Sequence, residues 1–368
     1  MPTRVVVLRG HQANPWELRP WELLDERFEV RFLRSERNWF DPGQIGLEAE
    51  EARTLRGLLP RGRLGDLAVR LPGDRYLGLA DHLRGADIVH SQELGYWYSA
   101  QAARLKERLG FRLVLTVWET LPFLDAYRNV RTRPYRRRTL EAADLFLAAS
   151  ERAREGLVLE GADPARIRVA PPGIDTSRFT ASGAIPPGPP TVLSPGRLVW
   201  EKGHQDVLRA LALLRRRGEA PPGARIVIVG SGPEEKRLTS YAAELGIADA
   251  VEVREFVPYE RMPALYAEAA CMVLGSLPVW SWEEQFGMVL VEAMACGVPV
   301  LAASSGAIPE VLGGGGRLFA PGDWPGLAAL LRDELEGPRP HSVAEPKRVE
   351  RFSAAAAAER LAEAYGTL

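Results

Sequence analysis

The amino-acid sequence predicts an α/β protein made of two doubly wound domains, each with a parallel sheet covered by helices. Three observations support this fold class. The chain has 368 residues, which suits two domains of ordinary size. Short apolar segments alternate with helical patterns from end to end, as in parallel sheets whose strands are buried on both faces. A segment rich in proline and glycine, residues 181–190, separates two such series and is predicted to be a linker.

The first series contains six apolar segments that we expect to be strands. They are residues 4–8, 28–33, 87–91, 112–117, 144–150 and 166–170. Helical patterns lie between the later strands, over about 95–109, 134–143 and 151–160. Residues 41–75 fit neither pattern well, and we expect them to be helical with an irregular loop rich in arginine and glycine. These elements together form an N-terminal domain over residues 1–180.

The second series follows the linker and forms a C-terminal domain over residues 191–345. Its expected strands are residues 191–195, 224–230, 250–256, 271–276 and 298–304. Its helices are expected over about 203–217, 233–245, 260–270 and 287–296. A last helix, rich in alanine and glutamate, is expected within residues 346–368. Ligands of open α/β sheets bind outside the carboxyl ends of the strands, so we expect a central cleft lined by those ends.

Composition and charge narrow the class of protein further. The net charge is −1, which argues against nucleic acid as the partner of the whole molecule. The two cysteines, Cys271 and Cys296, lie in apolar segments, which excludes a disulfide scaffold or a cysteine zinc site and fits a reducing compartment. No apolar run has the length of a membrane-spanning helix, and the first residues do not resemble a signal peptide. We therefore expect a cytoplasmic protein.

One segment is strongly basic. Residues 128–138, from Arg128 to Arg138, carry six arginines and no acidic residue. Such a segment could contact anionic lipid at the inner membrane face, or a phosphorylated acceptor. The alternative is a solvated helix face beside the apolar Leu140 and Ala143.

The segment EEQFGMVLVEAMACGVPVLAASSGAIPEVL, residues 283–312, is the most informative. Glu284 and Glu292 stand eight residues apart with Gly287 between them, and Gly287 opens a predicted helix whose free N–H groups can hold an anion. Eight helical residues rise about 12 Å, which exceeds the roughly 5–9.5 Å between paired glycosidase carboxylates. The spacing suits two carboxylates that hold hydroxyl groups at opposite ends of an elongated ligand. The alternative is an amphipathic helix with two solvated glutamates.

This segment resembles family 4 of the retaining glycosyltransferases, which are nucleotide-sugar enzymes of the GT-B fold. Further segments follow in the family's order: APPGIDTSRF (170–179), GRLVWEKG (196–203), VGSGPEEKRL (229–238) and EFVPYERMPALYAEAACMVLGS (255–276). The resemblance extends over about residues 166–335 and is weak before them. It implies a GT-B architecture in which the C-terminal domain binds the nucleotide sugar, the N-terminal domain binds the acceptor, and the last helix returns to the N-terminal domain.

The resemblance assigns most of the donor site. Arg197 and Lys202 would bind the diphosphate and stabilise the charge that develops as it leaves. Glu292 would accept hydrogen bonds from the ribose hydroxyls, and Glu284 would hold hydroxyls of the transferred sugar. The remaining donor-side positions contribute backbone groups or border the nucleobase: Gly196, Ser231, Gly232, Glu255, Phe256, Phe286, Gly287 and Met288. The family usually has glycine where this chain has Glu255, which leaves the base open.

The acceptor side departs from the family. Only Gly10 remains of the usual glycine-rich loop after the first strand. Where the family often has a histidine, this chain has Trp118 and Glu119, and we expect Glu119 to bind the acceptor hydroxyl. His90 and Glu93, at the end of a neighbouring strand, are further acceptor-side candidates. For His90, a structural role at the strand end is the alternative. A salt bridge from Glu119 to an arginine such as Arg128 is the structural alternative.

The predicted reaction is transfer of a sugar, with retention of configuration, from a nucleoside-diphosphate sugar to an acceptor hydroxyl. The acceptor can be a polysaccharide, a lipid-linked sugar or a small molecule. Glu284, Arg197, Lys202 and Glu119 are the expected catalytic residues. No metal and no cofactor are expected, because Arg197 and Lys202 supply the positive charge and the nucleotide sugar is itself a substrate. A nucleotide-sugar epimerase or hydrolase and an inactive nucleotide-sugar-binding protein remain alternatives.

Overall fold

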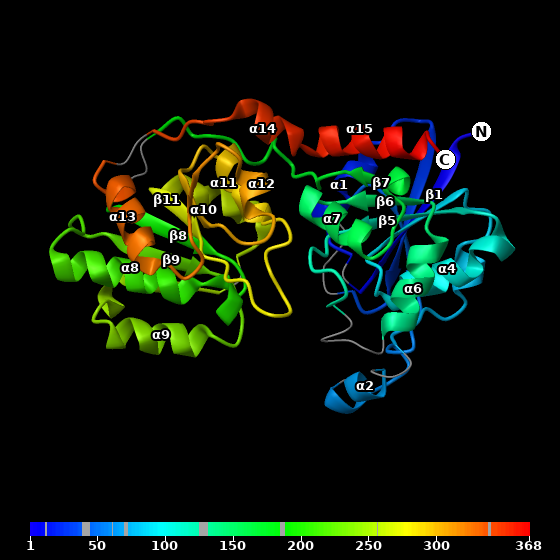
Figure 1. Ribbon diagram of the computed structural model, residues 1–368, viewed down its shortest axis with the longest axis horizontal. Helices are drawn as coiled ribbons and strands as arrows, with labels where there is room; N and C mark the ends of the chain where they lie inside the picture. Colours follow the sequence, from blue (N-terminus) through cyan, green and yellow to red (C-terminus); the bar gives the residue numbers. More distant parts are fainter. Residues whose placement is uncertain are drawn as a thin grey trace. The chain divides into compact units, whose positions relative to one another are not determined.

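The structure is a computed structural model that describes residues 1–11, 13–38, 45–60, 62–69, 73–124, 132–184, 188–255, 257–337 and 340–368. It contains two compact units (Figure 1). Unit 1 comprises Met1–Ile174 together with Phe352–Leu368, and unit 2 comprises Asp175–Arg351. Each unit is built on one parallel sheet with helices on both faces, which confirms the predicted fold class.

Unit 1 has a seven-stranded sheet in the order β3-β2-β1-β4-β5-β6-β7, and every neighbouring pair is parallel. The order reverses between β1 and β4, which creates the topological switch point where ligands bind in doubly wound sheets. The strands are β1 (Thr3–Gly10), β2 (Phe28–Ser35), β3 (Glu48–Ala52), β4 (Ile88–Gln92), β5 (Arg112–Val117), β6 (Leu145–Ala148) and β7 (Ile167–Val169).

Alternate residues along these strands supply two cores, because successive side chains point to opposite faces of the sheet. One face packs against α3 (Leu79–His82), α4 (Trp97–Leu109), α7 (Glu151–Leu159) and the end of α6 (Arg133–Ala142). The other face packs against α1 (Pro15–Glu22) and α15 (Ala354–Tyr365), which contact each other (Figure 1). Another helix of this unit is α2 (Arg63–Ala68).

Unit 2 has a six-stranded parallel sheet in the order β10-β9-β8-β11-β12-β13, with its switch point between β8 and β11. Its strands are β8 (Thr191–Pro195), β9 (Arg225–Val229), β10 (Val251–Arg254), β11 (Cys271–Leu274), β12 (Val300–Ala303) and β13 (Arg317–Phe319). The core of one face includes α8 (His204–Arg217), α9 (Glu235–Glu244) and α13 (Trp324–Leu335). The unit also contains α10 (Met262–Glu268), α11 (Met288–Ala295), α12 (Ile308–Leu312) and α14 (Pro346–Arg351).

The prediction for residues 41–75 is wrong in part. The helix α2 does form there, but Glu48–Ala52 is the edge strand β3. Its sequence, EAEEA, lacks the β-branched residues that favour strands, so local propensity points to a helix. Pairing with β2 overrides that propensity, and ion pairs between Arg31 and Glu50 and between Arg34 and Glu51 join the two strands.

The last predicted helix is also wrong as a single element. It is interrupted after Arg351, and α15 begins anew at Ala354. The Ser353 hydroxyl caps α15 by accepting a hydrogen bond from the N–H of Ala356 at 3.1 Å. The carbonyl of Phe352 accepts a hydrogen bond from the N–H of Ile174 at 2.8 Å. This bond joins the interruption between α14 and α15 to the last residue of the first segment of unit 1.

A buried hydrogen-bond relay joins α1 and α15 to the sheet of unit 1. The Trp21 indole N–H donates to the Tyr365 hydroxyl oxygen at 2.8 Å. The hydroxyl lies 2.6 Å from Nδ1 of His90, whose Nε2 lies 2.7 Å from Oγ1 of Thr116. An indole nitrogen can only donate, so the Tyr365 hydroxyl accepts from Trp21 and keeps its own proton available for Nδ1 of His90; in that arrangement His90 donates from Nε2 to Thr116. Burial lowers the pKa of His90 well below its usual range, so the histidine of the relay is neutral.

Replacing Tyr365 with phenylalanine should lower the free energy of unfolding of unit 1. The change leaves the Trp21 donor and the His90 acceptor unpaired, at a cost of about 1–3 kcal/mol for each buried group. Urea unfolding monitored by tryptophan fluorescence measures the effect. Tyr135→Phe is the matched control, because the Tyr135 hydroxyl is partly exposed and accepts a long 3.4 Å bond from Arg75. Equal losses in the two variants would contradict the relay.

Candidate functional site

The loop after β8, residues 196–203, begins at the switch point of unit 2 and is fastened to the loop after β9. The N–H of Gly196 donates to the backbone carbonyl of Val229 at 2.9 Å, and the N–H of Leu198 donates to the backbone carbonyl of Ser231 at 2.9 Å. A Cβ atom on Gly230 would lie 1.9 Å from the carbonyl oxygen of Gly196, so only glycine fits there. The glycines of both motifs thus allow two loops to pack backbone against backbone.

Arg197 projects from this interlocked backbone. Its side chain is exposed, and among the described residues no hydrogen bond or ion pair holds the guanidinium. The backbone carbonyl of Arg197 is held by Nε2 of the buried His204 at 3.1 Å, while the His204 Nδ1 lies 2.8 Å from the Ser194 hydroxyl. Burial, reinforced by the charge of Lys202, lowers the pKa of His204 to about 4, so it stays neutral. The sequence analysis missed His204, because a histidine at the start of a helix carries no motif.

Lys202 and Glu284, predicted from separate motifs, are in direct contact. The ammonium Nζ lies 2.7 Å from Oε2 of Glu284, and the Ser276 hydroxyl donates to the same oxygen at 2.7 Å. Both side chains are largely buried, with 14 % and 8 % of the lysine and glutamate side-chain surfaces exposed. The Trp282 ring centroid lies 4.9 Å from Nζ. The pair connects the loop after β8 with the loop after β11, on the two sides of the switch point.

The helix α11 begins beside this pair. Gly287 precedes it with φ +81° and no side chain caps its first N–H groups. Phe286 is buried, whereas Met288 is partly exposed. Uncapped N–H groups and the positive end of the helix dipole favour a bound anion, provided that a cationic or polar partner lies close. Here Glu284, which binds Lys202, lies three residues before Gly287.

Glu292 lies in the second turn of α11 and is only 4 % exposed. Its Oε2 accepts a bond of 2.8 Å from the Tyr266 hydroxyl, and Tyr259 also bonds to the carboxylate. Burial raises the pKa of Glu292 to about 7, although both tyrosine hydroxyls oppose the shift. Phe179 packs edge-on against both tyrosines. The sequence analysis did not single out these tyrosines, whose apolar neighbours resemble an ordinary helix face.

The remaining donor-side predictions lie in exposed loops. Ser231 is exposed and Gly232 is partly exposed in the loop after β9, and Glu255 is exposed directly after β10. Phe256 lies outside the described residues. The roles assigned to these positions stay predictions.

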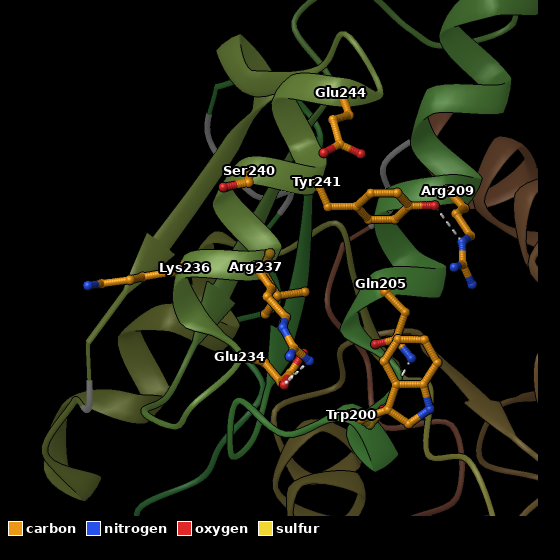
Figure 2. Close-up of a pocket in the computed structure, with 10 residues that line it drawn as sticks. Trp200, Gln205, Arg209, Glu234, Lys236, Arg237, Ser240, Tyr241 and Glu244 are labelled. Atoms are coloured by element: carbon orange, nitrogen blue, oxygen red, sulfur yellow. Dashed lines mark hydrogen bonds and ion pairs between the residues drawn. The ribbon is translucent and has the colours of Figure 1, made fainter.

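A separate open groove of about 390 Å³ lies between α8 and α9 (Figure 2). Arg209 donates from Nε to the Tyr241 hydroxyl at 2.8 Å, and its Nη1 lies 2.6 Å from Asp206. Glu234 pairs with Arg237 at 3.0 Å. None of the predicted donor residues lines this groove, which the sequence analysis did not identify.

In unit 1 the structure places His90 in the core rather than at a surface. It is fully buried, both ring nitrogens are bonded as described above, and burial lowers its pKa well below the usual range. The prediction that His90 faces an acceptor directly is therefore corrected. His90 lies in the core, where its two ring nitrogens bond to Tyr365 and Thr116. Gly10 ends β1 with φ +58°.

The end of β5 shows which predicted residues share a face. Thr116 and Trp118 line one small pocket, as expected from the alternation of a strand. Glu119 is partly buried, and its Oε1 accepts a bond of 2.9 Å from the N–H of Leu121. Glu93, with a left-handed φ of +56°, accepts a bond from the N–H of Trp118 at 2.8 Å. Burial raises the pKa of Glu93 to about 8. Both carboxylates thus hold backbone at the strand end, and the acceptor role of Glu119 stays a prediction.

The basic segment 128–138 does not form one solvated face. Its first four residues, Arg128 included, lie outside the described residues. On α6, Arg136 is buried and pairs with Glu160, whereas Arg133, Arg137 and Arg138 are exposed. Over the part of the chain that the structure describes, no three acidic, histidine or cysteine side chains gather as metal ligands, and no helix has the length and apolarity to cross a membrane.

Comparison with known proteins identifies the family. The family of glycosyl transferases group 1 matches residues 175–358, and glycosyltransferase family 4 matches residues 22–178. The chain belongs to these glycosyltransferases. The first match covers unit 2 with every donor-side residue described above, and the second covers most of the first segment of unit 1.

Individual proteins agree with this assignment. D-inositol 3-phosphate glycosyltransferase 2 of Catenulispora acidiphila is 32 % identical over 316 residues, which cover 76 % of this chain and 70 % of the relative. The structure of HepE from Anabaena in complex with UDP is similar over all of both chains, with a TM-score of 0.76 and 20 % identity. Sucrose-phosphate synthase from Thermosynechococcus elongatus also has a TM-score of 0.76, at 22 % identity over 99 % of this chain and 98 % of that chain. The two structures show that the glycosyltransferase has the GT-B fold.

Glu292→Gln should make unit 2 less sensitive to pH. Because the folded pKa is raised to about 7, the folded protein holds this proton more tightly than the unfolded chain, and stability falls as pH rises from about 4.5 to 7. The loss is of the order of 3 kcal/mol, and the glutamine variant lacks it. Urea unfolding at pH 5 and pH 8 measures the difference, with the exposed Glu244→Gln as control. Parallel pH profiles for wild type and Glu292→Gln would show that this carboxylate does not titrate in the folded protein.

Proposed function

We propose that this glycosyltransferase moves a sugar, with retention of configuration, from a nucleoside-diphosphate sugar to an acceptor hydroxyl. The observation that carries the proposal is the grouping at the switch point of unit 2. The loops after β8 and β11 carry an exposed arginine with no partner among the described residues, a lysine–glutamate pair, and a helix whose N-cap makes no side-chain bond. Positive groups of this kind together with a carboxylate suit a ligand with a diphosphate next to hydroxyl groups.

Arg197 is the first candidate for the diphosphate. Since no described residue bonds to its guanidinium, Arg197 keeps its donors for phosphate oxygens, and the neutral His204 bonds to its backbone carbonyl. The N–H groups at the start of α11 supply further donors. These groups are in place before the reaction, so they stabilise the charge of the departing diphosphate without reorganisation.

Glu284 is suited to hold the transferred sugar. Lys202 and Ser276 both bond to Oε2, and no bond is assigned to Oε1 among the described residues. We assign Oε1 to sugar hydroxyls, while Lys202 stays close enough to share its charge between the carboxylate and a phosphate oxygen. The same arrangement leaves Glu284 poorly placed as a nucleophile, because its charge is already compensated by Lys202.

Glu292 is suited to the ribose. Its carboxylate is held by two tyrosine hydroxyls, which fix its orientation and leave acceptor capacity for further donors. An ionised carboxylate accepts hydroxyl bonds more strongly than a protonated one, so nucleotide binding should favour the ionised form. The residues that would border the base, Glu255 among them, do not select one nucleotide, and we propose UDP-sugars as the first donors to test because the similar HepE structure contains UDP.

For the chemical step we propose departure of the diphosphate and attack of the acceptor on the same face of the sugar. The leaving phosphate oxygen takes the proton of the acceptor hydroxyl, the new glycosidic bond forms, and the bond to the diphosphate breaks. The relatives' name suggests a phosphorylated cyclitol as one acceptor to test, alongside sugars and lipid-linked sugars. Contact of the segment 128–138 with an anionic membrane stays a prediction of the sequence.

Arg197→Ala should lower kcat by about 100- to 1,000-fold, because it removes a preorganised donor to the departing charge. The Kd for the free nucleoside diphosphate should change far less. Release of the nucleoside diphosphate with and without acceptor, together with NMR of the product linkage, measures turnover, transfer and stereochemistry. Arg216→Ala, an exposed residue in the last turn of α8, is the control. Near-normal turnover of Arg197→Ala would remove this residue from the mechanism, and inversion at the anomeric carbon would overturn the proposed step.

Transferase activity should survive excess EDTA. The proposal assigns the diphosphate charge to Arg197, Lys202 and the start of α11, so it requires no bound divalent cation. Initial rates are measured after dialysis against EDTA and again after Mg²⁺ or Mn²⁺ is restored. A complete loss that either cation reverses would mean that a metal carries the charge instead.

A further inference from the structure

Unit 1 contains a buried arginine that forms no ion pair among the described residues, although the charge of Glu17 acts on it from farther away. Arg9 lies next to the end of β1, beside the switch point, and is only 3 % exposed. Its Nη1 donates to its neighbour's carbonyl, that of Leu8, at 3.3 Å, and its Nε has no partner. Among the described residues no carboxylate oxygen lies within 4 Å of the guanidinium. Its other close contact is the Trp21 ring, whose centroid is 4.8 Å from the guanidinium carbon.

Such an arrangement is costly in a protein without a ligand. A buried charge loses its hydration, and buried cations are normally paired with a carboxylate or hydrogen-bonded at every donor. Burial lowers the pKa of Arg9, but an arginine stays protonated in proteins. The guanidinium therefore carries an unused donor at Nε and a charge that only the more distant Glu17 opposes.

Arg9 lines a pocket of about 50 Å³ at the carboxyl ends of the strands. A water molecule needs at least about 10–15 Å³ of such space, so the pocket has room for a few waters or one small anionic group. Two aromatic side chains, Trp21 and Trp118, form part of its walls. Pro171 and Pro172 form another part and have no backbone N–H to offer.

Thr116 supplies a second polar group to this pocket. Its side chain lines the pocket, and its Oγ1 lies 2.7 Å from Nε2 of the buried His90. A hydroxyl can both donate and accept, so when His90 donates to Oγ1 the threonine proton is available to a ligand.

Glu17 lines the same pocket and interacts electrostatically with Arg9, but within the described part of the chain the two form no ion pair. An anionic group bonded to Arg9 gives the guanidinium the acceptor that it lacks, and a hydroxyl beside that group gives the Glu17 carboxylate a donor. A sugar or cyclitol that carries one anionic group and free hydroxyls satisfies both residues. The polar groups of the pocket thus select a ligand with both features.

We propose that unit 1 binds the acceptor through an anionic substituent, phosphate or carboxylate, held by Arg9 and Thr116, with Glu17 accepting a neighbouring hydroxyl. Calling this ligand the acceptor rests on the proposed function. Binding of the ligand to Arg9 and Thr116 does not depend on that function. It specifies the class of acceptor as an acidic sugar or cyclitol. It also assigns the carboxyl ends of β1 and β5 as the binding edge.

Binding to the full chain without donor is the first test. Glucose 6-phosphate, glucuronate and glucose are compared by calorimetry and by the shift in melting temperature, with inorganic phosphate and acetate as bare anions. We expect one acidic sugar to bind at least 10-fold more tightly than glucose, and the better of the two identifies phosphate or carboxylate. Equal binding of glucose and both acidic sugars, or binding of none of them, would overturn the proposal.

Variants identify the site. Arg9→Met should abolish the preference for the acidic sugar. Its melting temperature without ligand should stay near that of wild type, because the substitution removes a buried charge that has no ion pair, and burial raises the pKa of Glu17 so that this carboxyl can take up a proton. Thr116→Val should weaken acidic-sugar binding several-fold. Arg27→Met is the control, since Arg27 is exposed and pairs with Asp25. Should Arg9→Met fail to fold, Arg9→Gln and Thr116→Val decide, and unchanged acidic-sugar binding in both would overturn the site.

Donor binding separates this proposal from the proposed function. UDP affinity should be unchanged in Arg9→Met, because the donor residues all belong to unit 2. If acidic sugars bind at Arg9 but no donor yields transfer, the site stands and the proposed reaction fails. If transfer proceeds equally well to neutral and acidic sugars and Arg9→Met does not change the ratio of their kcat/KM values, the reaction stands and this site fails.

Discussion

The ion pair between Lys202 and Glu284 is the contact on which the organisation of unit 2 depends. Its partners come from loops that leave adjacent strands, β8 and β11, in opposite directions around the sheet. A reversal of strand order creates the space between such loops. A charged pair that is largely buried stabilises the contact between the loops only when further hydrogen bonds fix its geometry. Ser276 provides one of these bonds, and the interlocked backbone of residues 196–203 and 229–232 provides the rigid base.

The two units each place an arginine near the switch point of their sheet, but they differ in its exposure. Both sheets reverse their order beside the first strand, and both place an arginine at that strand's end, Arg9 in unit 1 and Arg197 in unit 2. Arg197 is exposed on a loop, whereas Arg9 is buried in the sheet face that α1 and α15 cover. An exposed arginine costs little while it waits for a ligand. A buried one imposes a continuous energetic cost, which a bound anion would relieve.

The sequence predicted the fold well where side-chain patterns are local. The apolar strands and the long helices of both units lie close to their expected positions because buried parallel strands require near-continuous apolar runs. It failed at Glu48–Ala52, where cross-strand ion pairs override helix propensity, and at Phe352–Ser353, where a contact with Ile174 interrupts a helical pattern. Such long-range contacts leave no local periodicity in the sequence.

The same difference between local patterns and other contacts applies to the residues of the candidate site. Motif residues such as Arg197, Lys202 and Glu284 could be found because their spacing is carried by short loops. Supporting groups without a motif could not be found. His204 bonds to the nearby Arg197 carbonyl but carries no sequence signal, whereas Tyr266 and Tyr365 act on Glu292 and His90 through contacts between distant segments. Strand alternation correctly placed Thr116 and Trp118 on one face, but it could not reveal that Glu119 would accept a bond from the N–H of Leu121.

The position of α15 has a consequence for the synthesis of this chain. Unit 2 is one continuous stretch, so all of its residues have emerged from the ribosome before those of α15. Unit 1 lacks part of one face until Leu361, Ala364 and Tyr365 arrive, and until then Trp21 and His90 have no hydroxyl between them. Domains fold as units during translation, which gives this protein an inverted order in which the second unit is completed before the first. Unit 1 meanwhile keeps an apolar surface exposed, and transiently exposed surface of this kind favours aggregation.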